Sequence, residues 1–206
     1  KDHGVRIPPQ AVAATADEAV ELAETLGYPL SVKIHSQDIR HKSDVGGVKL
    51  NIKNADELRE AFSTVMDNCR KNAPQARLEG VLLKPMLKGG AEMIIGVNND
   101  KDFGPMVMVG MGGVFVELFK DVQFAPAPLT QNQALRMIEN LASYPLLNGY
   151  RGGEVCDKQA LARLLVKISQ MAADGKDTIK ELDINPVFVT ADGAEIADAL
   201  LVVYDI

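Results

Sequence analysis

A loop-like segment at residues 41–50, HKSDVGGVKL, combines residue types that can bind phosphate: a histidine, two lysines and two adjacent glycines. Residues 28–35 before it alternate apolar and polar side chains, which predicts a strand with Lys33 on its polar face. The backbone N–H groups of Gly46 and Gly47 could approach an anion closely, and the Lys33 ammonium would add a point charge to the same oxygens. A solvated strand lysine and an ordinary glycine turn explain the same residues, so the pattern alone leaves phosphate binding open.

A second group of candidate residues lies near the C-terminus, where ELDINPVFV and EIADALLVV flank a TADG turn and predict a hairpin. Alternation puts Glu181, Asp183 and Asn185 on one face of the first strand. The hairpin register then brings Asp198 close to the position opposite Asn185. Such carboxylate and amide oxygens suit Mg²⁺, which completes its shell with water and phosphate oxygens. A polar outer hairpin face is the simpler alternative, although Pro186 is poorly placed in a plain ladder.

The composition narrows the classes of partner and compartment. Net charge is -6 and lysines and arginines form no run, which argues against a nucleic-acid-binding surface or a membrane-binding patch. Cys69 and Cys156 lie far apart without a Cys/His cluster, so neither a disulfide framework nor a zinc site is indicated and a cytoplasmic location is expected. The sequence shows neither a membrane-length apolar stretch nor a signal-peptide pattern. Lys1 and the helix-tail-like KDHGVRIPP predict a piece of a longer polypeptide.

Caps and periodicity predict a mixed α/β chain. Helices are expected to begin after Thr15, Asn54, Thr130 and Asp157. Strands are expected at residues 28–35, 80–86, 92–97, 106–109, 114–119, 181–189 and 195–203. Glycine turns at residues 88–90 and 111–113 could mark the edges of a smaller antiparallel lobe. Because the second turn leads into an expected strand and not a helix, a dinucleotide-binding fingerprint is disfavoured.

Five segments occur in this order over nearly the whole chain: GYPLSVKIHSQDIRHKSDVGGVKL, GVLLKPMLKGGAEMIIGV, FGPMVMVGMGGVFVELFKDV, NGYRGG and ELDINPVFV. Together they resemble the ATP-grasp domain of the NDP-forming acyl-CoA synthetases, among them ADP-forming acetyl-CoA synthetase and, more distantly, succinyl-CoA synthetase. The resemblance implies an α/β (α+β) ATP-grasp fold with two lobes and a nucleotide cleft between them. Residues 1–206 would then be one ATP-grasp domain of a larger enzyme.

The resemblance implies phosphoryl transfer between ADP or ATP and a phosphohistidine, coupled to acyl-CoA formation or cleavage. The implied cofactors are Mg²⁺ and ATP/ADP, and the implied partners are the CoA-binding and ligase domains of the same enzyme, fused or separate. His41 matches a phosphoryl relay, a role that a neutral imidazole can support. A histidine that only hydrogen-bonds phosphate is the alternative at this position.

Other site residues are also carried over from the resemblance. The implied nucleotide-binding residues are Lys33 for phosphate, Gly46, Gly47 and Val48 in the glycine loop, Leu83, Lys84 and Met86 beside the adenine, and Glu92 for ribose or phosphate. Asn185 and Asp198 match the magnesium ligands, and Asp183 matches an acidic residue near the transferred phosphoryl group. Arg151 in NGYRGG matches one family arginine, whereas the QFAP segment carries no arginine where relatives often do.

Proteins with two other functions contain related domains. A non-catalytic, ligand-sensing module of a protein acetyltransferase fusion would be expected to have lost catalytic residues, yet His41, Asp44, Asp183 and Asn185 are all present. A stand-alone carboxylate–amine ligase of the same fold would have no use for a relay histidine. The enzyme interpretation is therefore favoured.

Overall fold

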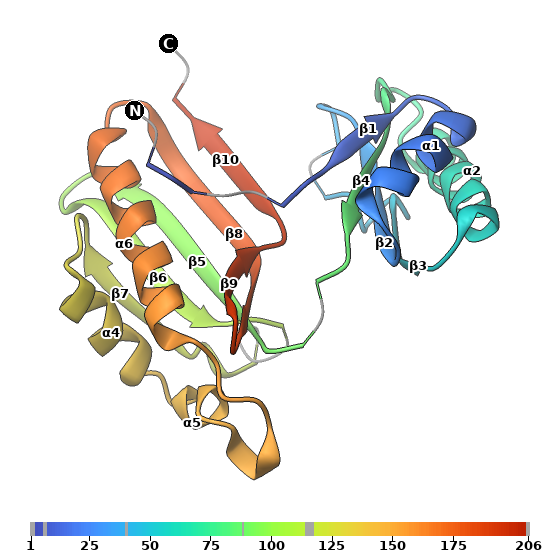
Figure 1. Ribbon diagram of the computed structural model, residues 1–206. Helices are drawn as coiled ribbons and strands as arrows, with labels where there is room; N and C mark the ends of the chain where they lie inside the picture. Colours follow the sequence, from blue (N-terminus) through green and yellow to red (C-terminus); the bar gives the residue numbers. More distant parts are fainter. Residues whose placement is uncertain (1–2, 6–7, 40, 88, 114–117, 205–206) are drawn as a thin grey trace. The chain divides into compact units, whose positions relative to one another are not determined.

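The computed structural model describes residues 3–5, 8–39, 41–87, 89–113 and 118–204. The chain divides into two compact units, one formed by Pro8–Leu87 and a larger one formed by Lys1–Ile7 with Lys88–Ile206 (Figure 1). The division falls at the predicted 88–90 turn, whereas the 111–113 turn lies within the larger unit. No helix in the described ranges is long and apolar enough to cross a membrane.

The smaller unit is a four-stranded antiparallel sheet with two helices. In sheet order the strands are β1 (Ala11–Ala13), β4 (Gly80–Pro85), β2 (Leu30–His35) and β3 (Val48–Ile52), and the helices are α1 (Ala16–Leu26) and α2 (Ala55–Asn72). Leu30, Val32 and Ile34 are fully buried and pack with the apolar residues of both helices, as the alternation of β2 predicts. Ser31, expected on the polar face, is also buried, and its hydroxyl is satisfied because it donates to the Lys84 carbonyl at 3.2 Å.

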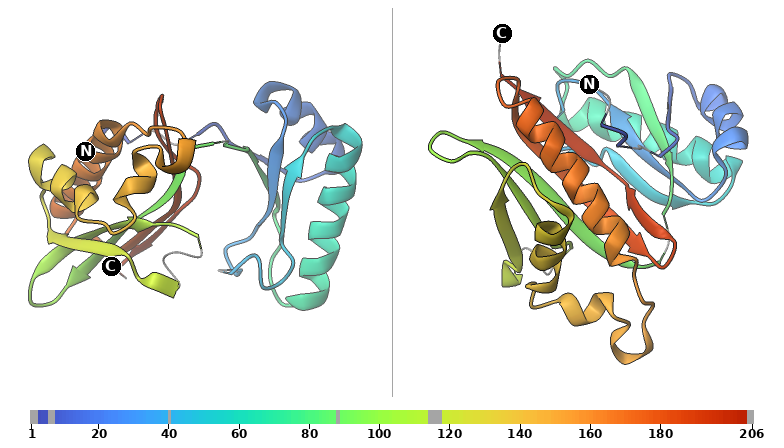
Figure 2. Two further views of the ribbon diagram at one scale, coloured as in Figure 1. Left: turned by 90° about the horizontal axis from the view of Figure 1, so that it is seen from below. Right: turned by 60° about the vertical axis from the view of Figure 1, so that its left-hand side comes forward.

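The larger unit contains a six-stranded antiparallel sheet. Its path runs β10 (Ala199–Val203), β8 (Ile179–Thr190), β5 (Ala91–Asp100), β6 (Gly104–Met111) and β7 (Val122–Pro126), and β9 (Gly193–Ile196) pairs with β8. The helical segments are α4 (Gln131–Glu139), α5 (Tyr144–Leu147), the 3-10 turn η1 (Tyr150–Gly152) and α6 (Lys158–Asp174). Helices α4 and α6 cover one face of this sheet (Figure 2). Alternate residues of β5, Met93, Ile95 and Val97, point into the core beneath them.

The predicted caps begin the helices as expected. The side chains of Thr15, Asn54, Thr130 and Asp157 each accept a hydrogen bond from the backbone N–H three residues later. These bonds satisfy amide groups that have no partner within the helix. Local sequence therefore places all four helix starts correctly.

Two strand predictions need correction. Residues 114–117 of the expected 114–119 strand lie outside the described residues, and Leu118 and Phe119 are helical. A left-handed Lys120, with φ of 50°, turns the chain there before β7, a strand that the sequence did not predict. The expected 195–203 strand is two strands, β9 and β10, separated by Ala197 and Asp198. The residues of this break remain hydrogen-bonded to β8. The Ala197 N–H donates to the Pro186 carbonyl at 2.9 Å.

Candidate functional site

Lys33 lies in the middle of the smaller unit's sheet. It is half-buried on β2, directly opposite Leu82 of β4 and Val48 of β3. The neighbouring residues on β2, Val32 and Ile34, point into the core, so the Lys33 ammonium is directed to the other face. The fold thus brings two of the predicted nucleotide-binding residues, Lys33 and Val48, side by side on adjacent strands.

The loop after β2 carries His41, which is exposed to solvent. Within this loop the Gly46 N–H donates to the Ser43 carbonyl at 3.0 Å and the Gly47 N–H donates to the Lys42 carbonyl at 2.8 Å. Both glycine amides therefore donate inside the loop, and the role of Gly46 and Gly47 in nucleotide binding stays a prediction.

Close packing explains why glycines occupy these positions. A Cβ atom at Gly47 would lie 2.7 Å from Ile34 Cγ2 and 2.9 Å from the Lys42 carbonyl oxygen. Gly46 has φ of +69°, a left-handed conformation that favours glycine. The Asn68 side chain on α2 donates to the Gly46 carbonyl at 3.1 Å and thereby fixes the loop to the helix. Sequence reasoning missed this anchor, whose only signal is an asparagine beside the apolar face of an amphipathic helix.

The predicted adenine-contacting strand is mostly buried. Leu83 is fully buried in the smaller unit's core and Lys84 is 7% exposed. The Met86 side chain is half-buried, and the Met86 N–H donates to the Pro29 carbonyl at 2.8 Å. Because the Leu83 side chain points inward, only its backbone groups could contact a ligand, whereas Met86 presents a side chain as well.

The predicted magnesium ligands lie together in the larger unit. The Asn185 N–H donates to the Asp198 carbonyl at 3.1 Å, so these residues occupy the facing positions that the hairpin register predicts. Asp183 and Asn185 are exposed, whereas Leu182 and Ile184, which alternate with them along the strand, are buried. The β8 alternation therefore directs the candidate ligands away from the core.

The electrostatics of this group suit a cation. Desolvation raises the pKa of the Asp183 carboxyl, and the nearby Asp198 charge raises it further. A divalent cation would offset the repulsion between these two carboxylates. No cluster of three or more His, Cys, Asp or Glu side chains that could hold a metal occurs in the described ranges. The donor set instead fits Mg²⁺, since this ion needs only one or two protein carboxylates and Asn185 adds an amide oxygen.

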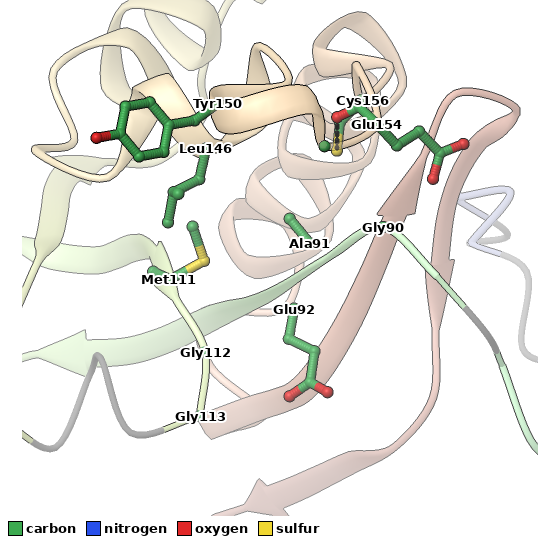
Figure 3. A pocket seen from close by; sticks show the side chains of 11 residues that line it. Gly90, Ala91, Glu92, Met111, Gly112, Gly113, Leu146, Tyr150, Glu154 and Cys156 are labelled. Carbon is green, nitrogen blue, oxygen red and sulfur yellow. Dashed lines mark hydrogen bonds between the residues drawn. The ribbon is translucent and has the colours of Figure 1, made fainter.

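A pocket of about 530 Å³ lies at one end of β5 (Figure 3). Its lining includes Glu92, Gly112, Leu146, Tyr150 and Cys156. Figure 3 shows the Glu92 carboxylate pointing away from Leu146 and Tyr150, which approach from the other side of the strand. The Gly112 N–H donates to the Glu92 carbonyl at 2.7 Å, so the glycine turn after β6 fixes the backbone beneath this carboxylate.

Arg151 is exposed on the loop beside this pocket. It has a left-handed backbone, with φ of 54°, and its guanidinium lies 5.4 Å from the centroid of the Tyr150 ring. The loop is tied to the end of β8, because the Ala191 N–H donates to Glu154 Oε1 at 3.1 Å. The strand that carries Asp183 therefore also anchors the Arg151 loop. Sequence reasoning missed Glu154, whose signal is an acidic residue directly after a glycine-rich loop.

Each unit gathers a part of the predicted site. The smaller unit carries Lys33, His41, Gly46, Gly47, Val48, Leu83, Lys84 and Met86, and the larger unit carries Glu92, Arg151, Asp183, Asn185 and Asp198. The roles of these residues in binding and catalysis stay predictions.

Comparison with known proteins gives consistent matches over the whole chain. A family model described as an ATP-grasp domain matches residues 1–203. The chain is 45% identical over 204 residues to the beta subunit of ADP-forming acetate–CoA ligase II of Pyrococcus furiosus, covering 98% of this chain and 86% of the relative.

Two solved structures of acetyl-coenzyme A synthetase 1 from Candidatus Korarchaeum cryptofilum are also similar. One, in complex with coenzyme A, Ca-AMPCP and HgCl+, matches with a TM-score of 0.94 and 39% identity over 98% of this chain and 88% of that chain. Another contains coenzyme A and Mg-AMPPCP, with its phosphohistidine segment pointing towards the nucleotide-binding site. It matches with a TM-score of 0.84 and 35% identity over 98% of this chain and 87% of that chain.

Proposed function

Because this chain belongs to the ATP-grasp family, we propose that it is the nucleotide-binding half of an ADP-forming acyl-CoA synthetase. It would transfer a phosphoryl group between ADP or ATP and a phosphohistidine, while a CoA-binding partner, fused or separate, forms or cleaves the acyl-CoA. The observation that carries the proposal is the facing pair Asn185 and Asp198 beside Asp183. These are the oxygen donors that a magnesium nucleotide requires. The 45% identity to a beta subunit of such a ligase gives independent support.

Different residues of this chain would bind the magnesium nucleotide and transfer the phosphoryl group. Asn185 and Asp198 would hold Mg²⁺, which when bound neutralises charge on the phosphate oxygens. Lys33 and Arg151 would bind the phosphoryl oxygens, since phosphoryl transfer depends mainly on positioning and charge neutralisation. Met86 and Glu92 would hold the nucleoside.

His41 would act as the phosphoryl relay. A neutral nitrogen of its imidazole attacks the phosphorus of the partner's phosphohistidine, and the P–N bond to the partner breaks as that imidazole leaves. A terminal oxygen of ADP then attacks the phosphorus on His41, which releases the imidazole and forms ATP. The exposure of His41 on its loop is compatible with access from a partner.

The test combines a binding measurement with a transfer measurement on the complex of this chain with its CoA-binding half. Thermal shifts with Mg-ADP should show binding, because a ligand of the native state raises apparent stability. Lys33→Ala should remove most of this shift. His41→Asn should stop transfer of labelled phosphate from the partner to ADP and leave the shift intact, since a relay acts only in the chemical step.

Each part of the proposal has its own contradicting result. No thermal shift at millimolar nucleotide with Mg²⁺ would remove the nucleotide-binding role. Wild-type transfer by His41→Asn would leave binding in place but make His41 a positioning residue. Acyl-CoA synthesis by this chain without a partner would contradict its role as half of an enzyme. The proposed compartment is the cytoplasm, a reducing environment in which cysteines such as Cys69 and Cys156 would stay thiols.

A further inference from the structure

The loop that carries Arg151 is closed at its base and exposed at its tip. At the base, the Cys156 N–H donates to the Leu147 carbonyl at 3.0 Å, and both of these residues are buried. Residues 150–155 between them are all exposed to solvent. Burial in the core therefore fixes the two ends of the loop and leaves the position of its tip to hydrogen bonds.

Two hydrogen bonds connect this loop to the turn that follows β8. The Asp157 N–H donates to the Thr190 carbonyl at 2.7 Å, a backbone bond at the base of the loop. The Ala191 N–H donates to Glu154 Oε1 at 3.1 Å, and this bond depends on the side chain at position 154. Figure 3 shows the Glu154 side chain extending from the loop towards the β8–β9 hairpin. Glu154 thus holds the loop closer to its tip than the backbone bond does.

The backbone of Arg151 needs such support. Its φ of 54° is left-handed, a conformation that is unfavourable for a residue with a side chain. Residues in this region persist where the surrounding structure holds them. The Arg151 guanidinium also lies over the Tyr150 ring, at 5.4 Å from its centroid, so its direction depends on the shape of the loop tip. Glu154 lies three residues further along the chain and restricts that shape.

The anchor of the loop is close in the sheet to a second residue of the candidate site. Along β8, Phe188 pairs with Glu92 of β5, and Val189 pairs with Ala91. Ala191, which binds Glu154, follows two residues after Val189. Glu92 and Glu154 also line the same pocket. The Glu154 bond therefore sets the position of the loop relative to Glu92.

We propose that Glu154 is a positioning residue for phosphoryl transfer, an inference that rests on the proposed function. Its carboxylate accepts the Ala191 N–H and thereby holds the loop in the shape that directs the Arg151 guanidinium at the phosphoryl oxygens. Glu154 exchanges no group with the nucleotide and acts through Arg151. Positioning of this kind matters in phosphoryl transfer, which depends mainly on the placement of charged groups.

Three variants separate the hydrogen bond from the charge of Glu154. In the complex with the CoA-binding half, Glu154→Ala should slow single-turnover transfer from the labelled phosphohistidine to ADP on the order of fivefold, the loss expected for one hydrogen bond. Glu154→Gln removes the charge but keeps an oxygen that accepts the Ala191 N–H, so it should transfer at nearly the parental rate. Asp192→Ala removes a carboxylate from the same turn, keeps the Glu154 bond and should also match the parent.

A double-mutant cycle tests whether Glu154 acts through Arg151. In an Arg151→Ala background, Glu154→Ala should cause no further loss of transfer, because the guanidinium that it positions is already absent. Equal losses in both backgrounds would show that Glu154 affects transfer independently of Arg151 and would overturn the proposal.

Trypsin provides a measurement that does not depend on activity. Trypsin cleaves after arginine, and the rate of cleavage after Arg151 reports how often the loop opens. Glu154→Ala should speed this cleavage several-fold in the chain without nucleotide, whereas Glu154→Gln should not. Cleavage after Arg77, an exposed residue of the smaller unit, provides the internal reference and should be the same in all variants.

The outcomes distinguish this inference from the proposed function. Parental transfer and parental cleavage in Glu154→Ala would overturn the positioning role and leave the proposed function intact. Equal losses in Glu154→Ala and Glu154→Gln would overturn it too, by assigning the effect to the charge. Absence of transfer in the unaltered complex would instead contradict the proposed function, and the trypsin comparison would still show whether Glu154 holds the loop.

Discussion

Replacing Gly47 with alanine tests whether the glycine loop is built for packing or for anion contact. The new Cβ atom would lie 2.7 Å from Ile34 Cγ2, 2.9 Å from the Lys42 carbonyl oxygen and 3.0 Å from Cys69 Sγ. Real Cβ atoms essentially never show contacts under 3.0 Å, so the first two of these distances require neighbouring atoms to shift. The Lys42 oxygen cannot move away at low cost, because it accepts the Gly47 N–H at 2.8 Å.

The size of the effect follows from this overlap. Inserting one methyl group into a closely packed site costs about 1–3 kcal/mol. For a unit of this size, about 1 kcal/mol lowers Tm by about 4–8 °C. Gly47→Ala should therefore lower the melting temperature of the smaller unit by at least about 4 °C without any ligand present. The chain has no tryptophan, so the transition is best followed by far-UV circular dichroism.

A double-mutant cycle provides the control. Cys69→Ala removes one of the three contacts, so the double variant should be more stable than the sum of the two single effects predicts. A Gly47→Ala variant with the parental melting temperature would refute the packing argument. If that variant also lost its Mg-ADP thermal shift, the glycine would have to serve the ligand directly.

Three further perturbations test other parts of the structure. Ser169→Ala should cost about 1–3 kcal/mol in urea unfolding, because the buried Leu129 N–H loses the hydroxyl that it contacts at 2.9 Å, whereas Ser63→Ala on the exposed face of α2 should be nearly neutral. Desolvation tends to raise the pKa of Asp121, but hydrogen bonds from Ser143 and from the Ala142 N–H outweigh it and hold the pKa below its usual value. The stabilisation from this carboxylate should thus be present above the unfolded-state pKa of about 3.9 and be lost as pH falls through the lower folded-state value. Unfolding free energies over an acidic pH series should show this loss, and Asp121→Asn should remove it; an unchanged pH dependence would contradict the assignment. Asp198→Asn should abolish the magnesium-dependent part of the ADP thermal shift, and a shift that keeps its full magnesium dependence would exclude Asp198 as a ligand.

Local sequence was sufficient for the features that depend on neighbouring residues. The cap residues Thr15, Asn54, Thr130 and Asp157 placed the helix starts, because each cap bond joins groups only three residues apart. The facing positions of Asn185 and Asp198 followed from a short turn and the two-residue period of a strand. The family and its fold were also evident from the order of five motifs, and the ATP-grasp match over residues 1–203 confirms them.

Contacts between residues far apart in the sequence could be identified only from the tertiary structure. The amides of Gly46 and Gly47 bond within their own loop, and the need for glycine comes from Ile34, Asn68 and Cys69, which lie elsewhere in the sequence. A groove of about 640 Å³ on the larger unit's sheet likewise combines apolar side chains from the β5–β6 turn, β6, β7 and β10, and no sequence window contains such a set. Periodicity assigns a side chain to a face of its strand, but packing between distant segments determines what that face meets.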